Sequence, residues 1–99
     1  MKSVIGQFNE VLENRIRLGI VAVLAARASA DFTTLKGLLD TTDGNLASHM
    51  AVLERSRYVR VQKEFVGRKP QTTYLLTEAG RKAFRAHVDA LERLLKGAS

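Results

Sequence analysis

The stretch TDGNLASHMAVLERSRYVRVQKEF, residues 42–65, decides the fold of this chain. In its first half, Leu46, Met50 and Leu53 are spaced four and three residues apart, which places three apolar side chains on one face of a helix. Thr42 is the expected N-cap, because a threonine hydroxyl accepts a hydrogen bond from a free N–H of the first turn. The opposite face is small and polar near its start, so the helix can lie close against another surface.

The second half of the stretch predicts the first strand of a β-hairpin. From Tyr58 to Phe65 apolar and polar residues alternate, which is the period of two typical of a half-buried strand. Residues 66–70 form the expected turn, where Gly67 supplies permissive dihedral angles and Pro70 ends the pairing. Residues 72–76 return as a β-branched and aromatic strand.

A long helix is expected near the start of the chain. It runs from about Asn14, its N-cap, to about Ala28, and Asn9 caps a short turn before it. Its apolar residues recur at helical spacing and share one face; they are Leu12, Ile16, Ile20, Val23 and Leu24.

A short second helix connects this long helix to the helix that follows Thr42. Thr33 is its expected cap, and its three inward-facing residues are Leu35, Leu38 and Leu39. The segment from residue 40 to 43 then reads as a tight connection.

The last expected element is a helix from Thr77, its N-cap, to about Lys96, with Gly97 as a natural stop. An apolar stripe with spacings of four, three and four follows it, widened by Ala83 and Leu94. The stripe consists of Phe84, Val88, Leu91 and Leu95. It either completes the core of one subunit or forms a dimer interface. We favour the dimer, because one small domain rarely needs so long a helix to cover it.

Charge is concentrated in the middle of the chain. The 99 residues carry 16 Lys and Arg against 10 Asp and Glu, a net charge of +6. Six of the cations lie between residues 55 and 69, with Glu64 as the single anion. These cations are Arg55, Arg57, Arg60, Lys63, Arg68 and Lys69. Such a local excess attracts polyanions such as nucleic acid, although an uneven solvated surface would look similar.

Several classes of protein are excluded or disfavoured. The absence of Cys excludes disulfide scaffolds and thiolate chemistry. The first seven residues lack the apolar core of a signal peptide, and the apolar run from Ile20 to Ala26 is too short to span a membrane, so we expect a cytoplasmic protein. We expect no catalytic site, no metal and no cofactor; a metal site built from His87 and Asp89 is the weak alternative.

The order of elements predicts a mainly α fold with a two-stranded β wing, in one domain over residues 1–99. A helix-turn-helix would occupy about 33–57, the wing about 58–76 and the terminal helix about 77–96. The segments 45–54 and 58–59, the basic hairpin and the segment 76–81 resemble winged-helix regulators related to the MarR and ArsR groups. The similarity extends to Arg-Leu-Gly-Ile at 17–20, and covers about residues 8–95.

The resemblance implies a homodimeric transcription regulator that binds double-stranded DNA. The third helix would enter the major groove, and the hairpin would contact the backbone and the minor groove. The residues implied to face DNA are Thr42, Asn45, Ser48, His49, Arg55, Arg57, Arg60, Arg68 and Lys69. Thr42 and Asn45 alternatively serve only to cap the helix, and His49 is alternatively a packed or solvated residue.

The chain departs from the family pattern in two places. Relatives usually carry Gly before the Tyr-Val pair, to close the third helix in a left-handed conformation, but here Arg57 occupies this position. Ala51 and Val52 stand where relatives often place Lys, which would leave the wing a larger share of the affinity. A winged-helix module that binds protein rather than DNA, and an unknown small-molecule effector at the dimer interface, remain as alternatives.

Overall fold

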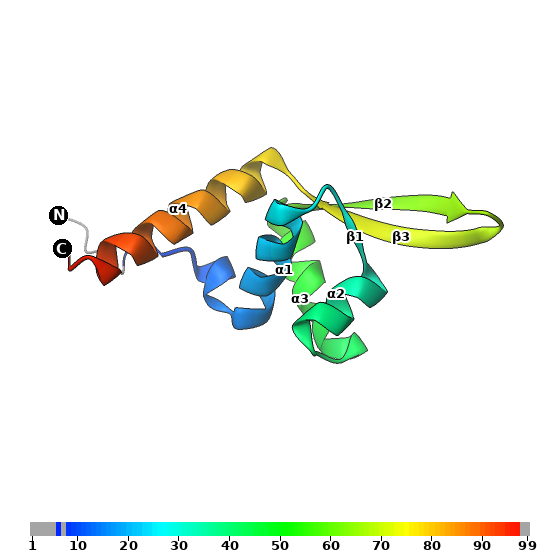
Figure 1. The fold of residues 1–99 in the computed structure, drawn as a ribbon, viewed down its shortest axis with the longest axis horizontal. Coiled ribbons are helices and arrows are strands. Elements are labelled where there is room, and N and C mark those ends of the chain that lie inside the picture. Colours follow the sequence, from blue (N-terminus) through cyan, green and yellow to red (C-terminus); the bar gives the residue numbers. More distant parts are fainter. Residues whose placement is uncertain (1–5, 7, 98–99) are drawn as a thin grey trace.

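The computed structural model describes Gly6 and residues 8–97, and Figure 1 shows them as an elongated molecule of 55 × 25 × 21 Å. Two arms leave a central group of helices in opposite directions: a β-hairpin on one side and the last helix on the other. The start of the chain, on which the expectation of no signal peptide rests, lies largely outside the described residues. Within the described part of the chain, no helix is long and apolar enough to cross a membrane.

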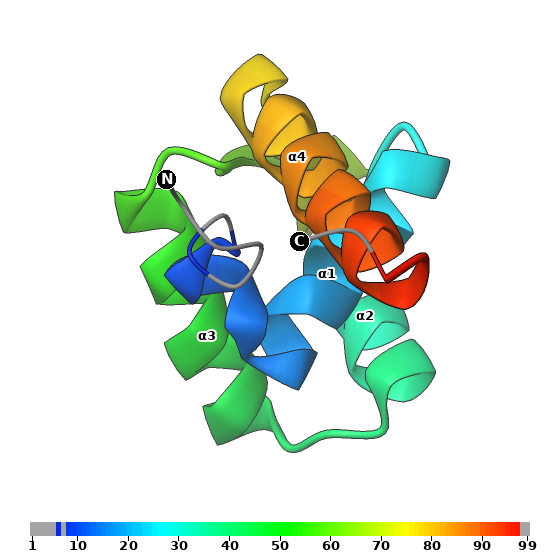
Figure 2. The same cartoon turned by 90° about the vertical axis from the view of Figure 1, so that its left-hand side faces the viewer.

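The first elements confirm two predicted caps. A short 3₁₀ helix, η2 (Glu10–Glu13), begins after Asn9, whose side chain accepts from the Val11 N–H at 2.9 Å. Helix α1 (Arg15–Ala26) begins after Asn14, whose side chain accepts from two backbone N–H groups of the first turn. Helix α1 contacts four later elements: α2 (Phe32–Leu39), α3 (Asp43–Arg55), β3 (Lys69–Leu76) and α4 (Glu78–Leu95). It is therefore the centre of the core, as Figure 2 shows.

Helix α2 (Phe32–Leu39) begins earlier than predicted. Its N-cap is Asp31 and not Thr33, because the Asp31 carboxylate accepts from the Thr34 N–H at 2.7 Å. With the earlier start, Phe32 joins Leu35 and Leu39 on the face of the helix that packs inward. The prediction that Leu38 faces inward is wrong; its side chain is 53% exposed, because it lies off the face that the other three share.

Helix α3 (Asp43–Arg55) follows the predicted pattern. The Thr42 hydroxyl accepts from the Asn45 N–H at 3.1 Å, so Thr42 is the N-cap. Leu46, Met50 and Leu53 are all buried, as their spacing predicted. They pack with residues of α1 and α2 in one continuous core.

The wing is a hairpin of β2 (Val59–Val66) and β3 (Lys69–Leu76), joined by a two-residue turn at 67–68. The prediction that Pro70 ends the pairing is wrong, because Phe65 pairs with Pro70 and Val66 with Lys69. At Pro70, β3 has a neighbour on one side only, an edge position where proline is tolerated. Gly67 has a φ of +66°, as the turn requires.

A third strand, which the sequence did not predict, completes the sheet. Strand β1 (Ala30–Asp31) pairs with β3 through Ala30 and Tyr74, so the strand order is β1-β3-β2. Asp31 also accepts from the Gln71 side chain at 2.7 Å, which ties the start of α2 to the wing.

Helix α4 (Glu78–Leu95) begins after Thr77, its predicted N-cap. The first turn of α4 packs tightly against the base of the wing. A Cβ on Gly80 would overlap the carbonyl oxygen of Tyr58. The second half of α4 points away from the wing (Figure 1), but its residues His87 and Ala90 are buried.

Candidate nucleic-acid interface

The outer face of the first two turns of α3 is open and has little bulk. Gly44, Asn45, Ala47 and Ser48 are exposed, and a Cβ placed on Gly44 would meet no atom within 4 Å. Ala51 and Val52 on the next turn are half-buried, while Arg55 at the end of the helix is exposed. The face therefore lets another surface approach the helix backbone closely, with a cation at its far end.

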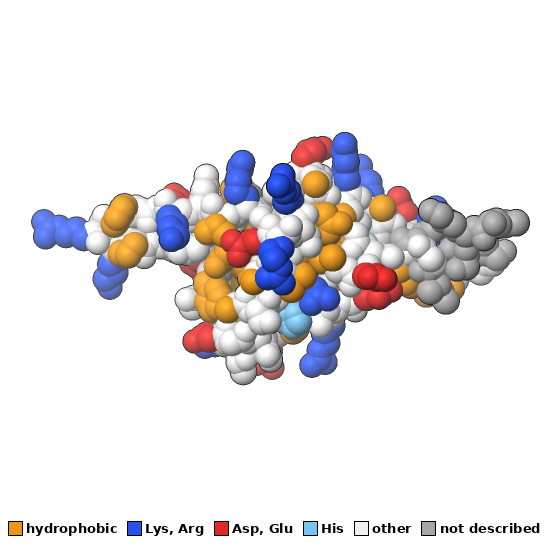
Figure 3. Space-filling view, turned by 180° about the vertical axis from the view of Figure 1, so that it is seen from behind, with side chains coloured by type: hydrophobic (Ala, Val, Ile, Leu, Met, Phe, Trp, Pro, Cys, Tyr) orange, Lys and Arg blue, Asp and Glu red, His pale blue; other side chains and the backbone are white. Residues whose placement is uncertain are grey.

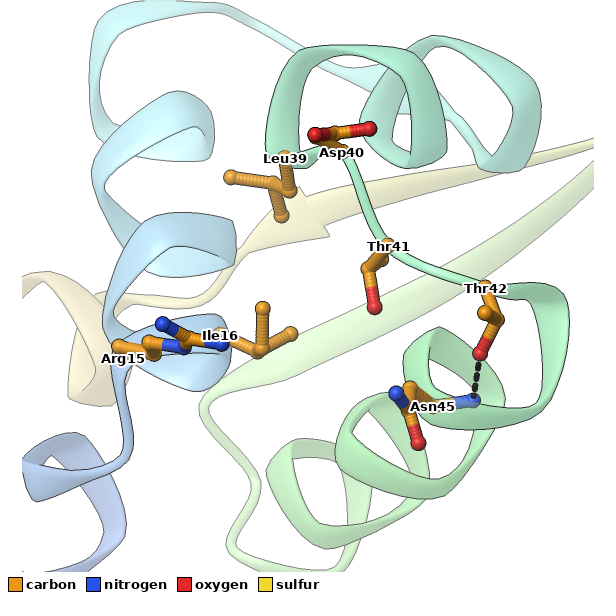
Figure 4. A pocket seen from close by; sticks show the side chains of 7 residues that line it. All are labelled: Arg15, Ile16, Leu39, Asp40, Thr41, Thr42 and Asn45. Carbon is orange, nitrogen blue, oxygen red and sulfur yellow. Dashed lines mark hydrogen bonds between the residues drawn. The ribbon is translucent and has the colours of Figure 1, made fainter.

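Asn45 lies at the edge of a cavity of about 570 Å³ between α1 and the α2–α3 connection. Arg15 and Ile16 border the cavity on the α1 side, and Leu39 and residues 40–42 border it on the other (Figure 4). Figure 4 shows the side chains of Thr41 and Asn45 directed toward this space. Arg15 is exposed, so a cation stands across the cavity from the Asn45 amide.

His49 faces α1 rather than the open face of α3. Its Nδ1 lies 3.0 Å from Nη1 of Arg17, which donates to it because a guanidinium has no acceptor. Nε of Arg17 donates to the Val11 carbonyl at 2.7 Å, so Arg17 links η2 to α3. Partial burial, and then the positive charge of Arg17, lower the pKa of His49 below its ordinary value. His49 thus helps to position α3, and its contact with DNA stays a prediction.

Helix α3 ends at a residue in the left-handed conformation, although this residue is an arginine and not a glycine. Arg57 has a φ of +62°, the conformation that glycine usually supplies at this position. The Tyr58 N–H donates to Leu53 O, and the Arg57 N–H to Glu54 O, each at 3.0 Å, which is the Schellman pattern. A non-glycine residue in this conformation costs about 1 kcal/mol.

Thr77 fixes this left-handed residue to the start of α4. Its hydroxyl donates to the Arg57 carbonyl at 2.7 Å and accepts from the Gly80 N–H at 2.9 Å. Its own N–H donates to the Tyr58 carbonyl at 3.0 Å. One threonine therefore holds α3, the base of the wing and α4 in a fixed relation, and the exposed Arg57 side chain stays beside the outer end of α3.

The wing divides its cations between its two faces. By strand alternation and register, Arg60 shares one face with Lys69, while Lys63 lies on the other; Arg68 is in the turn. All four side chains are exposed. Seen from behind, the molecule shows Lys and Arg side chains along the wing and across its middle (Figure 3).

The predicted stripe of α4 is only partly covered within one subunit. Phe84, Val88 and Leu91 are half-buried, and Phe84 packs against the core, whereas Leu95 is 85% exposed. Leu94 is 47% exposed. The most deeply buried residues of α4 are Gly80, His87 and Ala90, which lie next to this stripe on the helix.

His87 has a structural partner. It is buried, and its Nδ1 accepts from the backbone N–H of Asn9 at 3.2 Å. Among the described residues, no three His, Cys, Asp or Glu side chains are close enough together to hold a metal ion.

Two cations near α3 were missing from the residues expected to form the site. Arg15 borders the cavity beside Asn45, and Arg17 holds His49. Arg17 belongs to the quoted segment 17–20, but nothing local in the sequence shows that its side chain reaches α3, because the contact spans 32 residues.

Comparison with known proteins gives a consistent family. A family described as the winged helix DNA-binding domain matches residues 16–95. An uncharacterized protein of Methanocaldococcus jannaschii is 30% identical over 87 residues, which cover 88% of this chain and 95% of that protein. The structure of a transcriptional regulator homologue from Pyrococcus horikoshii OT3 has a TM-score of 0.83 and 34% identity, covering 90% of this chain and 88% of that one.

The same fold also occurs in a protein solved with DNA. MepR of S. aureus, in a structure described as a MepR–DNA complex, has a TM-score of 0.75 at 15% identity, covering 89% of this chain and 75% of that one. At this identity the likeness concerns the fold alone.

Proposed function

This chain belongs to the winged helix DNA-binding domain family, and we propose that it is a transcription regulator that binds double-stranded DNA as a homodimer. The observation that carries the proposal is the combination of two exposed surfaces. The first turns of α3 present small or polar side chains apart from the Asp43 carboxylate, which pairs with Lys36, and the wing carries four cations against one anion. The similarity to a transcriptional regulator homologue supports the regulatory role.

In this proposal the first half of α3 lies in the major groove. Asn45 and Ser48 are exposed, and their short side chains let the helix come close to the base edges. There an Asn amide pairs with adenine through two hydrogen bonds. Thr42 keeps its capping bond and offers its hydroxyl proton to a phosphate. His49, held by Arg17, contributes at the flank of the helix.

The wing and the end of α3 bind the backbone of the duplex. Arg55, Arg57, Arg60 and Lys69 are exposed and would neutralise phosphates. Arg68, in the turn of the hairpin, would enter the minor groove, where a narrow groove has a strongly negative potential.

The dimer is formed by the outer stripe of α4. Leu95 is almost uncovered in one subunit and Leu94 is about half exposed, and the half-buried Val88 and Leu91 extend this apolar surface. A second copy of the chain covers this surface and places two α3 helices on half-sites about one helical turn apart.

A small-molecule effector would bind beside this interface. A cavity of about 230 Å³ lies there, lined by Ala25, Arg81, Phe84, Arg85 and Val88. An anionic, partly apolar compound fits its two arginines and its apolar wall. A thermal-shift screen of such compounds tests this part, since a ligand that binds the folded state raises the melting temperature.

The test of the proposed function is direct binding. DNA fragments selected from a random library with the purified protein are titrated at several salt concentrations, and the affinity should fall with salt in proportion to the phosphates neutralised. Asn45→Ala should lower affinity for the selected sequence about tenfold, with little change on unrelated duplexes. Its matched control is Glu54→Ala, at an exposed position on the same helix away from Ser48. No binding to any duplex at low salt would leave the alternative of a protein-binding module.

A further inference from the structure

The tip of the wing exposes apolar side chains that contribute nothing to the core. Phe65 is 76% exposed and Val66 is 62% exposed, whereas most large apolar side chains nearer the base of the hairpin are buried or half-buried. The tip stands at the end of the arm, away from the helices (Figure 1). Folding of one subunit therefore gives no reason for a phenylalanine at this position.

The register shows what surrounds Phe65. Its cross-strand partner is Pro70, and the next pair on the same face is Lys63 with Thr72. Val66 and Lys69 form the last pair on the opposite face. One face of the tip thus combines an aromatic ring, a proline ring and a cation, with Arg68 at the adjoining turn.

The same face of the hairpin is the one that packs on the helices at its base. Val59 and Val61 belong to it by alternation, and both pack against the core with Tyr74 from β3. Beyond Val61 this face leaves the body and becomes open to solvent. It is therefore the face that overhangs the space beside the helices.

Charge indicates what kind of partner this face meets. The wing has Arg60, Lys63, Arg68 and Lys69 against Glu64 alone, and one carboxylate oxygen of Glu64 already accepts from the Thr73 hydroxyl at 3.1 Å. An apolar protein surface would not need four cations on the hairpin that carries the two rings. The minor groove of DNA matches both features, because its walls are deoxyribose C–H surfaces and its edges are phosphates.

We propose that Phe65 and Pro70 pack against the deoxyribose wall of the minor groove that Arg68 enters, while Lys63, on the same face of the hairpin, neutralises a phosphate at the edge of that groove. The inference rests on the proposed function and adds to it an apolar contact, which phosphate binding does not require. Apolar side chains are known to serve at minor-groove surfaces in other folds. The contact gives the wing an affinity that salt does not remove.

The test compares two tip variants on a library-selected duplex. Phe65→Ala should weaken binding about tenfold, from the apolar area that the ring buries, and should leave the slope of log affinity against log salt unchanged. Val66→Ala, at an exposed position on the opposite face, is the control and should stay within about twofold of the wild type. Both residues are exposed, so an unchanged melting temperature checks that the fold is intact.

The outcomes separate this inference from the proposed function. If the wild type binds no duplex, the proposed function fails and the inference fails with it. If the wild type binds and Phe65→Ala binds equally well, or if both variants lose affinity equally, only the contact at Phe65 is wrong. Phe65-dependent binding to phosphatidylglycerol vesicles, with no Phe65 effect on DNA, would assign the face to a membrane surface instead.

Discussion

The two arms of the molecule expose apolar side chains in opposite chemical surroundings (Figure 1). At the wing tip, Phe65 and Val66 are flanked by Arg68 and Lys69. At the end of α4, Leu95 is 85% exposed and Leu94 is 47% exposed, but the charges around them are balanced: Asp89 and Glu92 against Arg93 and Lys96. Both arms therefore expose large apolar side chains, and they differ in the charges that surround these side chains.

Charge decides which partner each arm suits. A surface with balanced charges can meet an identical copy of itself across a two-fold axis without repulsion. A surface with excess positive charge repels its own copy and attracts a polyanion. The comparison therefore supports the proposal that α4 meets a second subunit and that the wing meets DNA.

The largest expected effect comes from disrupting the proposed dimer interface on α4. Leu95→Asp places a charge in the proposed interface without disturbing the subunit, because the side chain is 85% exposed. Light scattering after size-exclusion chromatography should show a monomer, and affinity for a duplex with two half-sites should fall about a hundredfold as avidity is lost. Leu38→Asp, at an exposed leucine on α2, should leave the dimer intact. A dimer that survives Leu95→Asp would contradict the assignment of this arm.

The second largest effect tests whether the cations at the tip of the wing bind DNA. Arg68→Ala together with Lys69→Ala should lower DNA affinity about thirtyfold at roughly 0.15 M salt and flatten the salt slope by about 1 for each phosphate contact removed. The control removes two exposed cations from α4, Lys82→Ala with Arg85→Ala, and should change the slope little. Equal changes of slope in the two variants would mean that the net charge, rather than the wing, binds DNA.

A smaller effect concerns the junction between the helices and the wing. Arg57→Gly removes the strain of the left-handed conformation and should raise the free energy of unfolding by about 1 kcal/mol, while DNA binding weakens about fivefold. Chemical denaturation and DNA titration measure the two changes. If the variant is more stable and binds DNA as well as the wild type, the Arg57 charge has no part in binding.

The smallest effect is a pH dependence of stability from His49. Its pKa is lowered in the folded state, so the unfolded chain takes up a proton first as the pH falls below 6.5. The stability is therefore fully present above that pH and decreases as the pH falls toward the lowered pKa. His49→Asn, which keeps an acceptor for Arg17, should reduce the fall in melting temperature between pH 7 and 5 relative to the wild type. An identical fall in both proteins would exclude His49 as its source.

The helix starts were largely predictable from the sequence because a cap is a local interaction. Asn14, Thr42 and Thr77 each accept from an N–H two or three residues ahead, so the pattern is visible without the fold. Asp31 was missed because Thr33 is an equally good cap in isolation. The choice between them is supported by Gln71, whose hydrogen bond to Asp31 spans 40 residues.

The outer half of the wing was less predictable for a related reason. Alternation from Tyr58 to Phe65 suggested that every apolar residue on one face is half-buried, but β2 extends past the helices, so Phe65 is exposed. Strand β1 is two residues long, too short to show a period of its own. Arg15 borders the same cavity as Asn45, and Arg17 contacts His49. Both positions depend on how α1 packs against α3, which a local sequence pattern does not predict.

Hydroxyl-radical footprinting of protein side chains tests the central claim most directly, because it reports the exposure of both arms in one sample. The account predicts that, at a protein concentration at which the chain is already dimeric, adding the selected duplex protects Phe65 and leaves Leu95 unchanged, whereas raising the concentration from the monomeric range without DNA protects Leu95 and leaves Phe65 unchanged. If both side chains respond alike to DNA, or if Phe65 is protected only by protein concentration, the two arms do not have different partners and the account is wrong.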